Sequence, residues 1–261
     1  MSRSGGRGRR APEPSIAVSD ERGVRYLHFG TVWVQGAMRL RRPWDIELDY
    51  LRHMMAWQLF VEPRGEILQI GLGAASLAKY TWKRLPQARV VVVEIEPAVV
   101  AVARQQFGLP PEDDRLELVI EDGARYVAHP RNRGRFAVVQ VDAYDAAANG
   151  PVLGGPGFYA ACRRALAEPG VLVVNLFGMH SSLDDHLADL RDAFEGRVKL
   201  LPPVEAGNVI ALAFAGPKRR LSWPELYGRA TAIEETQPLR ATGWVNALRE
   251  ESPQGATALE A

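Results

Sequence analysis

Acidic residues and glycines occur in this sequence where short apolar runs end. Each run is followed by groups that could contact a ligand, namely Gly71, Gly73, Glu94, Glu96, Asp122, Gly123, Asp142 and Asp145. Because the carboxyl ends of parallel strands meet at one edge of an open sheet, and ligands bind there, we expect these residues to surround one site. One acid at a strand end is often merely solvated, but acids that end three successive strands beside a glycine loop favour a binding site.

The first glycine loop reads GLGAAS from Gly71 to Ser76. Its glycines allow a ligand to approach the backbone closely and open the next helix. The loop lacks the last glycine of the G-x-G-x-x-G dinucleotide pattern, because Ser76 occupies that position, and it contains no basic residue to hold a pyrophosphate. A nucleoside without phosphates therefore fits this loop better than NAD, and the dehydrogenase alternative is less favoured.

Two acids farther along the chain suit the rest of a nucleoside. Glu94 follows the glycine loop by about twenty residues, the spacing at which a strand-end acid reaches ribose hydroxyls. Asp122, followed by Gly123, ends the next apolar run. Acids at the second and third strand ends suit the ribose and the adenine amino group, respectively. These residues predict a nucleoside pocket at the carboxyl edge of the sheet.

The elements that must hold these residues alternate between strands and helices. Nearly continuous apolar runs, typical of strands buried on both faces of a parallel sheet, occur at residues 66–73, 89–96, 116–123, 136–145 and 171–178, with two more strands expected at 197–204 and 207–216. Helices are expected at residues 47–60, 75–85, 97–107, 157–167 and 180–194. The pattern predicts one doubly wound domain, a sheet with helices on both faces.

The ends of the chain are expected to differ from this domain. Residues 1–14 are rich in Gly, Arg and Pro and are predicted to be a disordered tail. Residues 15–60 carry alternating β-formers around a hairpin turn and predict a small β sheet with a connecting helix. The nucleoside-binding domain is then expected at residues 61–240, and a C-terminal tail at 241–261, of which residues 251–261 form a loose end.

The composition excludes several classes of protein. Hydrophobic residues make up 47 % and charged residues 24 % of the chain, and the formal net charge of +1 gives no overall field toward nucleic acid or a membrane surface. No apolar run is long enough to span a membrane, and no secretory signal follows the basic N-terminus. The single cysteine, Cys162, can form neither an internal disulfide nor a cysteine-based metal site alone. We therefore expect a cytoplasmic enzyme with no metal ion and no nucleic-acid or membrane partner.

In order and spacing, several segments together resemble the spermidine synthase (polyamine aminopropyltransferase) family over residues 15–216. The matching segments are FGTVWVQGAM, the helix that contains Tyr50, ILQIGLGAASL, VVVVEIEP, VIEDGARYV, VVQVDAYD, GFYAACRRAL and GNVIALAF. The resemblance implies an α/β fold, a Rossmann-like, class I methyltransferase-type doubly wound sheet with a small N-terminal β appendage. It also implies a homodimer and a donor site for decarboxylated S-adenosylmethionine, a co-substrate rather than a tightly bound cofactor.

The resemblance also assigns roles to single residues. Glu94 would hold the ribose, Asp122 and Gly123 the adenine, Gln35 another polar edge of the nucleoside, and Asp142 would be the general base. The acceptor would be a small amine such as putrescine. An alkyl amine has a pKa of about 10.4, like lysine, so it is protonated in neutral water and a carboxylate must take its proton before the nitrogen attacks.

Three further residues are candidates for holding the amine. Asp145, three residues after the base, could bind a cationic acceptor, while Tyr50 and Tyr144 could wall the pocket and form hydrogen bonds with the amine. For each of these three residues a purely structural role is an equal alternative.

Three positions depart from the family pattern on the amine-handling side. The family's glycine loop carries an acid where this chain has Ala74, an acid two places after the helix tyrosine is replaced by Arg52, and the proline after the second acid is Ala146. The adenosine-handling residues match better. Two alternatives therefore stand beside aminopropyl transfer: a class I methyltransferase that uses intact S-adenosylmethionine, and a non-catalytic nucleoside-binding or assembly paralogue.

Overall fold

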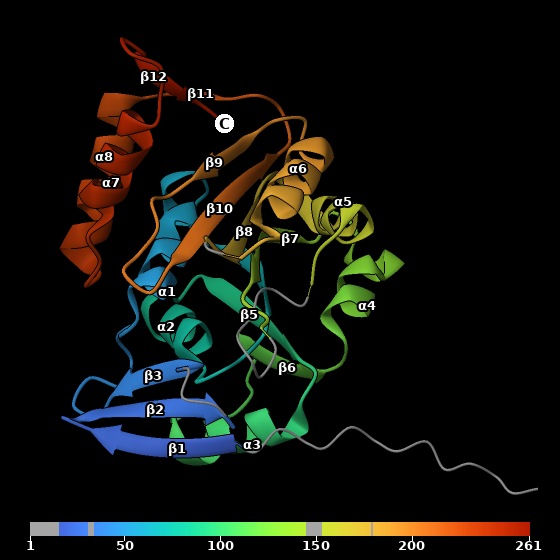
Figure 1. The fold of residues 1–261 in the computed structure, drawn as a ribbon, viewed down its shortest axis with the longest axis vertical. Helices are drawn as coiled ribbons and strands as arrows, with labels where there is room; N and C mark the ends of the chain where they lie inside the picture. The colour runs from blue at the N-terminus through green and yellow to red at the C-terminus, as the bar shows by residue number, and fades with distance from the viewer. Residues whose placement is uncertain (1–15, 31–33, 145–152, 179) are drawn as a thin grey trace, which may run out of the picture.

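Seven strands form one central sheet in the computed structural model, which describes residues 16–30, 34–144, 153–178 and 180–261 (Figure 1). In spatial order the strands are β6 (Leu116–Ile120), β5 (Ala88–Glu94), β4 (Gly65–Ile70), β7 (Phe136–Val141), β8 (Leu166–Phe177), β10 (Asn208–Ala215) and β9 (Val198–Leu200). The first five pair in parallel, whereas β10 runs antiparallel between β8 and β9. The chain turns back between β4 and β7, which is the topological switch point of the sheet.

Helices cover both faces of this sheet, as strands with continuous apolar runs require. One face is covered by α1 (Asp49–His53), the 3₁₀ helix η1 (Met54–Leu59), α2 (Ser76–Arg84), α3 (Pro97–Gln106), α7 (Trp223–Thr236) and α8 (Ala241–Glu250). The opposite face is covered by α4 (Gly123–Ala128), α5 (Pro156–Ala165) and α6 (Leu183–Ala193), with the 3₁₀ turn η2 (Pro130–Asn132) after α4. The structure thus confirms the predicted α/β class with a doubly wound sheet.

A second, smaller sheet precedes the domain and lies at the lower edge of Figure 1. Its strands are antiparallel in the order β1 (Ile16–Glu21), β2 (Val24–Phe29) and β3 (Gly36–Arg39). A two-residue turn joins β1 to β2, and both of its residues, Arg22 and Gly23, have positive φ angles of 48° and 79°. Such turns match the twist of the flanking strands. The predicted hairpin is therefore confirmed, although residues 31–33 lie outside the described residues.

This appendage is attached to the domain by a small apolar cluster. Leu27 and Met38 from the appendage pack with Ala74 and Phe107 of the domain. Beside the cluster, the buried ammonium group of Lys79 donates a hydrogen bond to the carbonyl of Phe107, with 2.6 Å between Nζ and O. Burial lowers the pKa of Lys79 from 10.5 to about 8. The attachment therefore contains one buried cation that helps to anchor the end of α3.

The segment predicted as one helix over residues 47–60 is instead divided. It forms a short α1 and then η1, and every residue of η1 is buried. A helix with one exposed face shows apolar residues at a spacing of 3.6 residues, whereas a segment that is buried on every side shows no such spacing. The composition of η1 therefore does not distinguish an α-helix from the more tightly wound 3₁₀ helix.

The prediction of a loose C-terminal end is wrong. The chain forms α8, and then β12 (Ala258–Glu260) pairs antiparallel with β11 (Arg220–Ser222). Leu259 and Ala261 are buried against the core beside α7 and α8. The predicted disorder of residues 1–14 concerns a segment outside the described residues.

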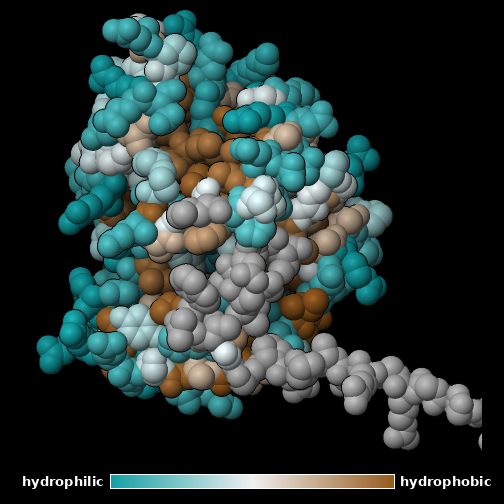
Figure 2. All heavy atoms as spheres, viewed as in Figure 1, coloured by the Kyte–Doolittle hydropathy of each residue, from teal (hydrophilic) through white to brown (hydrophobic). Residues whose placement is uncertain are grey.

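The surface seen in Figure 2 is mostly hydrophilic, and hydrophobic side chains show mainly toward its middle. No helix in the described part of the chain is long and apolar enough to cross a bilayer. The exposed large hydrophobic residues are scattered, at Val18, Val34, Leu40, Ile95 and Ile120. Two of them, Val34 and Ile95, border the cavity described next.

Candidate active site

A cavity of about 770 Å³ opens at the carboxyl ends of β4, β5, β6 and β7, where the sheet has its switch point. Nine of the ten site residues predicted from the sequence line this one cavity, namely Gln35, Tyr50, Gly71, Gly73, Glu94, Asp122, Gly123, Asp142 and Tyr144. The tenth, Asp145, lies outside the described residues. The fold therefore gathers residues from the appendage, from α1 and from four strand ends.

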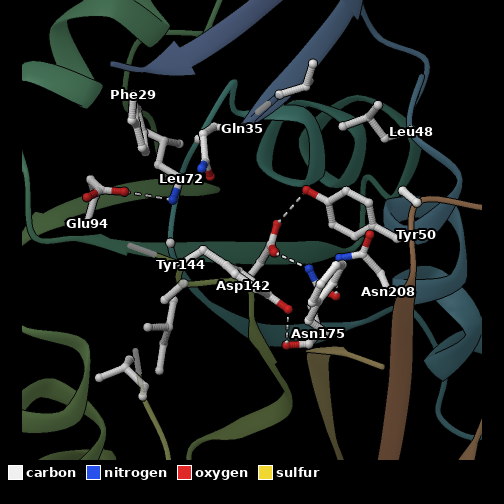
Figure 3. A pocket seen from close by; sticks show the side chains of 18 of the residues that line it. Phe29, Gln35, Leu48, Tyr50, Leu72, Glu94, Asp142, Tyr144, Asn175 and Asn208 are labelled. Atoms are coloured by element: carbon white, nitrogen blue, oxygen red, sulfur yellow. Dashed lines mark hydrogen bonds between the residues drawn. The ribbon is translucent and has the colours of Figure 1, made fainter. Parts of the chain in front are cut away.

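Glu94 ends β5 with its carboxylate against the glycine loop (Figure 3). Its Oε2 accepts a hydrogen bond from the amide of Leu72 at 2.9 Å, and its Oε1 accepts one from the amide of Glu96, also at 2.9 Å. Burial raises the pKa of Glu94, and these backbone hydrogen bonds oppose that rise. Each carboxylate oxygen can accept a second hydrogen bond, so the group is held in place and still able to bind a diol.

Glu96 itself is not among the residues that line the cavity. Its side chain accepts a hydrogen bond from the amide of Ala98 at 3.3 Å and caps the first turn of α3. Helix caps of this kind stabilise a helix end through an otherwise unpaired amide. The acid nearest to Glu94 in sequence thus has a structural role.

Asp122 caps the first turn of α4 and also lines the cavity. Its Oδ1 accepts a hydrogen bond from the amide of Arg125 at 2.9 Å, which caps α4. Its Oδ2 makes no hydrogen bond within the described part of the chain. One oxygen therefore orients the side chain, and the other can accept a hydrogen bond from a ligand.

Asp142 follows β7 and lies near the middle of Figure 3, with Glu94 to its left. Its amide donates to the carbonyl of Ile70 at 2.9 Å, which fixes its backbone beside β4. Its Oδ1 accepts a hydrogen bond from Nδ2 of Asn175 at 2.8 Å, and its Oδ2 lies 3.4 Å from the hydroxyl of Tyr50. Burial raises the pKa of Asp142 from 3.8 to about 6, although both hydrogen bonds act in the opposite direction.

Two asparagines that the sequence analysis missed complete this end of the cavity. Asn175 of β8 receives a hydrogen bond on Oδ1 from Nδ2 of Asn208, at 3.0 Å. The hydroxyl of Tyr144 donates to the backbone carbonyl of Asn175 at 3.1 Å. Asn175 could have been noticed as the one polar residue in the apolar run VLVVNLF, and Asn208 as the polar start of the last long strand.

The charge of the cavity is almost entirely negative. Six carboxylates line it, those of Glu47, Asp49, Glu94, Asp122, Asp142 and Glu205, and the described lining residues include neither Lys nor Arg. Two of these acids have partners outside the cavity, because Arg39 pairs with Glu47 and Arg52 with Asp49. Arg52, one of the family departures, therefore neutralises an acid at the rim without lining the cavity itself.

The second departure, Ala74, is buried in the glycine loop and is not among the residues that line the cavity. Its side chain is buried against Gly36 of β3, where an added Cβ at residue 36 would stand 2.5 Å from the Cβ of Ala74. The hydroxyl of Ser76 donates to the carbonyl of Ala37 at 3.1 Å. The loop is thus packed directly on the appendage, and only a glycine at residue 36 allows this approach.

Comparisons with known proteins show which family this chain resembles. The family model for the spermine/spermidine synthase domain matches residues 50–193. The chain is 37 % identical over 243 residues to a polyamine aminopropyltransferase of Chromobacterium violaceum, covering 93 % of this chain and 92 % of that protein.

Two solved structures share the fold. A probable spermidine synthase from Corynebacterium glutamicum has a TM-score of 0.67 at 21 % identity and covers 94 % of this chain and 86 % of its own. Human methyltransferase-like protein 13, solved in complex with SAH, has a TM-score of 0.62 at 24 % identity and covers 80 % and 96 %, respectively. With the family model matching more than half of its length and the Chromobacterium violaceum relative matching almost all of it, this chain belongs to the spermine/spermidine synthase family.

Proposed function

We propose that this protein transfers an aminopropyl group from decarboxylated S-adenosylmethionine to an amine acceptor such as putrescine. The observation that carries the proposal is the charge of the cavity, which six carboxylates line without any Lys or Arg among the described lining residues. Both substrates are cations, one a sulfonium with a primary ammonium group and the other an alkyl ammonium. The Chromobacterium violaceum relative is named for the same class of reaction.

The donor's nucleoside fits the side of the cavity near Glu94. In this proposal the Glu94 carboxylate accepts hydrogen bonds from the ribose hydroxyls, using the lone pairs that its backbone contacts leave. Asp122 accepts from the adenine amino group through Oδ2, with Gly123 beneath the ring. Gln35 and the glycine loop at residues 71–73 bound the rest of the nucleoside.

Asp142 is the general base of the proposed reaction. The acceptor's N–H bond breaks, its electron pair stays on nitrogen, and the proton bonds to the carboxylate. The neutral nitrogen then attacks the aminopropyl carbon beside sulfur, and the C–S bond breaks with its electrons going to sulfur, which becomes the thioether of methylthioadenosine. A carboxylate with a pKa of about 6 is a stronger base than an ordinary aspartate and is still mostly ionised at pH 7.

The acceptor amine is proposed to bind between Asp142 and the two tyrosines. Tyr50 lies within 3.4 Å of Asp142, and burial raises the pKa of Tyr50 well above its ordinary value, so its hydroxyl stays neutral. The hydroxyl of Tyr144 already donates to a backbone carbonyl, so it can offer the amine only its oxygen lone pairs. Asp145 is assigned the same acidic pocket by sequence position alone.

Methyl transfer from intact S-adenosylmethionine is the second candidate, because a methyltransferase bound to SAH shares the fold. Intact S-adenosylmethionine carries an α-carboxylate that decarboxylated donor lacks. A cavity lined by carboxylates and, among its described residues, by no Lys or Arg disfavours that group by like-charge repulsion. The charge of the cavity therefore favours the decarboxylated donor.

The test compares the two donors directly. We expect decarboxylated S-adenosylmethionine to raise the melting temperature more than the intact form, and incubation with putrescine to release methylthioadenosine. Release of S-adenosylhomocysteine, or stronger stabilisation by the intact donor, would replace this proposal with methyl transfer. Binding of either donor without turnover across a panel of amines would instead indicate a non-catalytic paralogue.

Three broader expectations stay predictions. They are a homodimeric assembly, a cytoplasmic location and the absence of a tightly bound cofactor. Size-exclusion chromatography with light scattering measures the first, cell fractionation the second and mass spectrometry of the native protein the third.

A further inference from the structure

The two oxygens of the Asp142 carboxylate have different surroundings (Figure 3). Oδ1 accepts a short hydrogen bond from the side-chain amide of Asn175, at 2.8 Å. Oδ2 has only a long contact, at 3.4 Å, with the hydroxyl of Tyr50. An amide can only donate through its nitrogen, whereas a hydroxyl can either donate or accept. The two oxygens are therefore not equivalent as proton acceptors.

The orientation of the Asn175 amide is fixed by a chain of hydrogen bonds with one possible direction. The ionised Asp142 carboxylate can only accept a hydrogen bond, so Asn175 must face it with Nδ2, which donates to Oδ1 of Asp142 at 2.8 Å. Oδ1 of Asn175 is then the atom that accepts from Nδ2 of Asn208, at 3.0 Å. The backbone carbonyl of Asn175 accepts a separate hydrogen bond from the hydroxyl of Tyr144, at 3.1 Å.

It follows that Asn175 must turn its nitrogen toward Asp142. Rotating the Asn175 amide by half a turn would place its oxygen against the Asp142 carboxylate and its nitrogen against the nitrogen of Asn208. Both contacts of the rotated amide would be repulsive. The direction of the chain is thus set at the Asp142 carboxylate, and Asn208 donates to Asn175 in the same direction.

We propose that Asn208 and Asn175 are positioning residues that leave Oδ2 as the oxygen of Asp142 that takes up the acceptor's proton. The inference rests on the proposed function, in which Asp142 is the base. A carboxyl oxygen that carries a proton is a weaker acceptor than one that does not, so protonation at Oδ1 would weaken the bond from Asn175. Protonation at Oδ2 keeps that bond, and the Tyr50 hydroxyl can turn from donor to acceptor.

The same arrangement keeps the base ionised near neutral pH. Burial alone would raise the pKa of Asp142 further, and the hydrogen bond from Asn175 is the strongest effect that opposes it. Other titratable groups line the cavity as well, and they are Glu47, Asp49, Tyr50, Glu94, Asp122, Tyr144, His180 and Glu205. Substituting an asparagine by leucine changes the charge of none of these groups, so its effect on the pKa of Asp142 does not come from a neighbouring charge.

The test measures the pKa of Asp142 without relying on turnover. Protein labelled with ¹³C at the aspartate carboxyl carbons is titrated by NMR, and the Asp142→Asn spectrum identifies the Asp142 signal. In Asn175→Leu, which removes the donor, we expect the pKa to rise by about one unit or more. In Asn208→Leu we expect a smaller rise, because Asn175 is then free to rotate and accept a proton from the neutral carboxyl group.

Gln69→Leu is the matched control, because it removes a buried amide that bonds Gln140 at 3.0 Å in the same sheet. It should lower stability and leave the pKa of Asp142 unchanged. An unchanged pKa in Asn175→Leu would overturn the proposal, and a shift in Asn175→Leu with none in Asn208→Leu would remove Asn208 from it. If Asn175→Leu does not fold, the pKa of Asp142 in Asn208→Leu, a substitution at a half-buried residue, decides whether the proposal holds.

The acid limb of kcat/KM gives a second readout, which should move upward in both asparagine variants by the same amount as the NMR pKa. If the NMR shifts are present but the wild-type protein transfers no aminopropyl group, then the proposed function has failed, although Asn175 and Asn208 still set the pKa of Asp142. If transfer occurs and the shifts are absent, then the positioning role of the two asparagines has failed and the proposed function stands.

Discussion

Gly71 and Asp142 are in direct backbone contact at the ends of adjacent strands. Gly71 has a φ angle of 95°, and a Cβ added there would stand 2.1 Å from the carbonyl oxygen of Asp142. The glycine loop proposed to contact the donor and the residue proposed as the base are thus in contact through their backbones. A change in either backbone must displace the other, so the two halves of the site are mechanically coupled.

We therefore expect Gly71→Ala to damage both halves at once. The substitution combines an unfavourable φ with a clash against backbone, which cannot move aside as a flexible side chain would. Donor affinity by calorimetry should fall at least about tenfold, a loss of about 1.4 kcal/mol. Gly23→Ala is the control, since its φ is also positive but no atom lies within 4 Å of the added Cβ. Equal effects from the two substitutions would disprove the coupling.

Asp142→Asn should preserve the fold and donor binding while it lowers turnover by about 10²–10⁴-fold, the usual contribution of a general base. The amide keeps the shape of the side chain but cannot take the ammonium proton. Turnover of the variant should recover partly as the pH is raised, because more acceptor amine is then neutral. Steady-state kinetics with putrescine between pH 6 and about 10 checks both points. A near wild-type rate would exclude Asp142 as the base.

The same substitution should stabilise the protein at neutral pH. The pKa of Asp142 is about 6 in the folded state and 3.8 as the ordinary value, so the folded protein binds more protons between these two pH values. Its stability therefore falls as the pH rises from 4 to 6, by at most about 3 kcal/mol from this group. Urea unfolding of wild type and Asp142→Asn should differ at pH 7 and converge below about pH 4. A variant that is less stable at pH 7 would contradict the assigned burial cost.

Glu94→Gln should weaken donor binding by about tenfold or more. The amide has a single oxygen, so it cannot accept hydrogen bonds from a diol through two oxygens as the carboxylate does. The glutamine can still accept one of the two backbone hydrogen bonds from Leu72 and Glu96, so the loop should largely keep its position. Glu96→Gln makes the same change of charge two residues away, outside the cavity, and should bind normally. Calorimetry with methylthioadenosine measures both. Unchanged affinity in Glu94→Gln would place the ribose elsewhere.

Lys79→Met tests the buried cation beneath the appendage. The pKa of Lys79 is about 8 in the folded state against 10.5 ordinarily, so the unfolded chain binds more protons between these values and wild-type stability gains as pH rises through them. The variant lacks this gain. Between pH 7 and about 9.5, the stability of wild type relative to the variant should therefore rise by about 2 kcal/mol. A difference that does not change with pH would show that the ammonium group reaches solvent.

The parallel sheet, and the gathering of glycines and strand-end acids in one cavity, could be predicted because both are encoded locally. The run Val90–Val93 is apolar at every position and almost fully buried, and the acid that follows it marks the strand end. Glycines and acids at strand ends then reach one cavity by topology alone. Such features need no knowledge of side-chain packing.

The residues that were missed depend on contacts between distant segments. Asn175 meets Asn208 only because β8 and β10 are antiparallel neighbours, and a lone polar residue in an apolar strand has no periodic signal. The polar, glycine-containing composition of residues 251–261 predicts a loose end. The burial of Leu259 and Ala261 depends instead on the pairing of β12 with β11, which comes much earlier in the chain.

The contact between Ala74 and Gly36 also constrains how this protein can evolve. Each residue occupies the space into which the other would grow, so a larger side chain at residue 36 is excluded while Ala74 stays buried against it. A carboxylate introduced at residue 74 would meet the backbone of β3 unless the appendage moved as well. Restoring an acid at residue 74 therefore needs coordinated substitutions in the glycine loop and in β3, so the effect of a change at either position depends on the residue at the other.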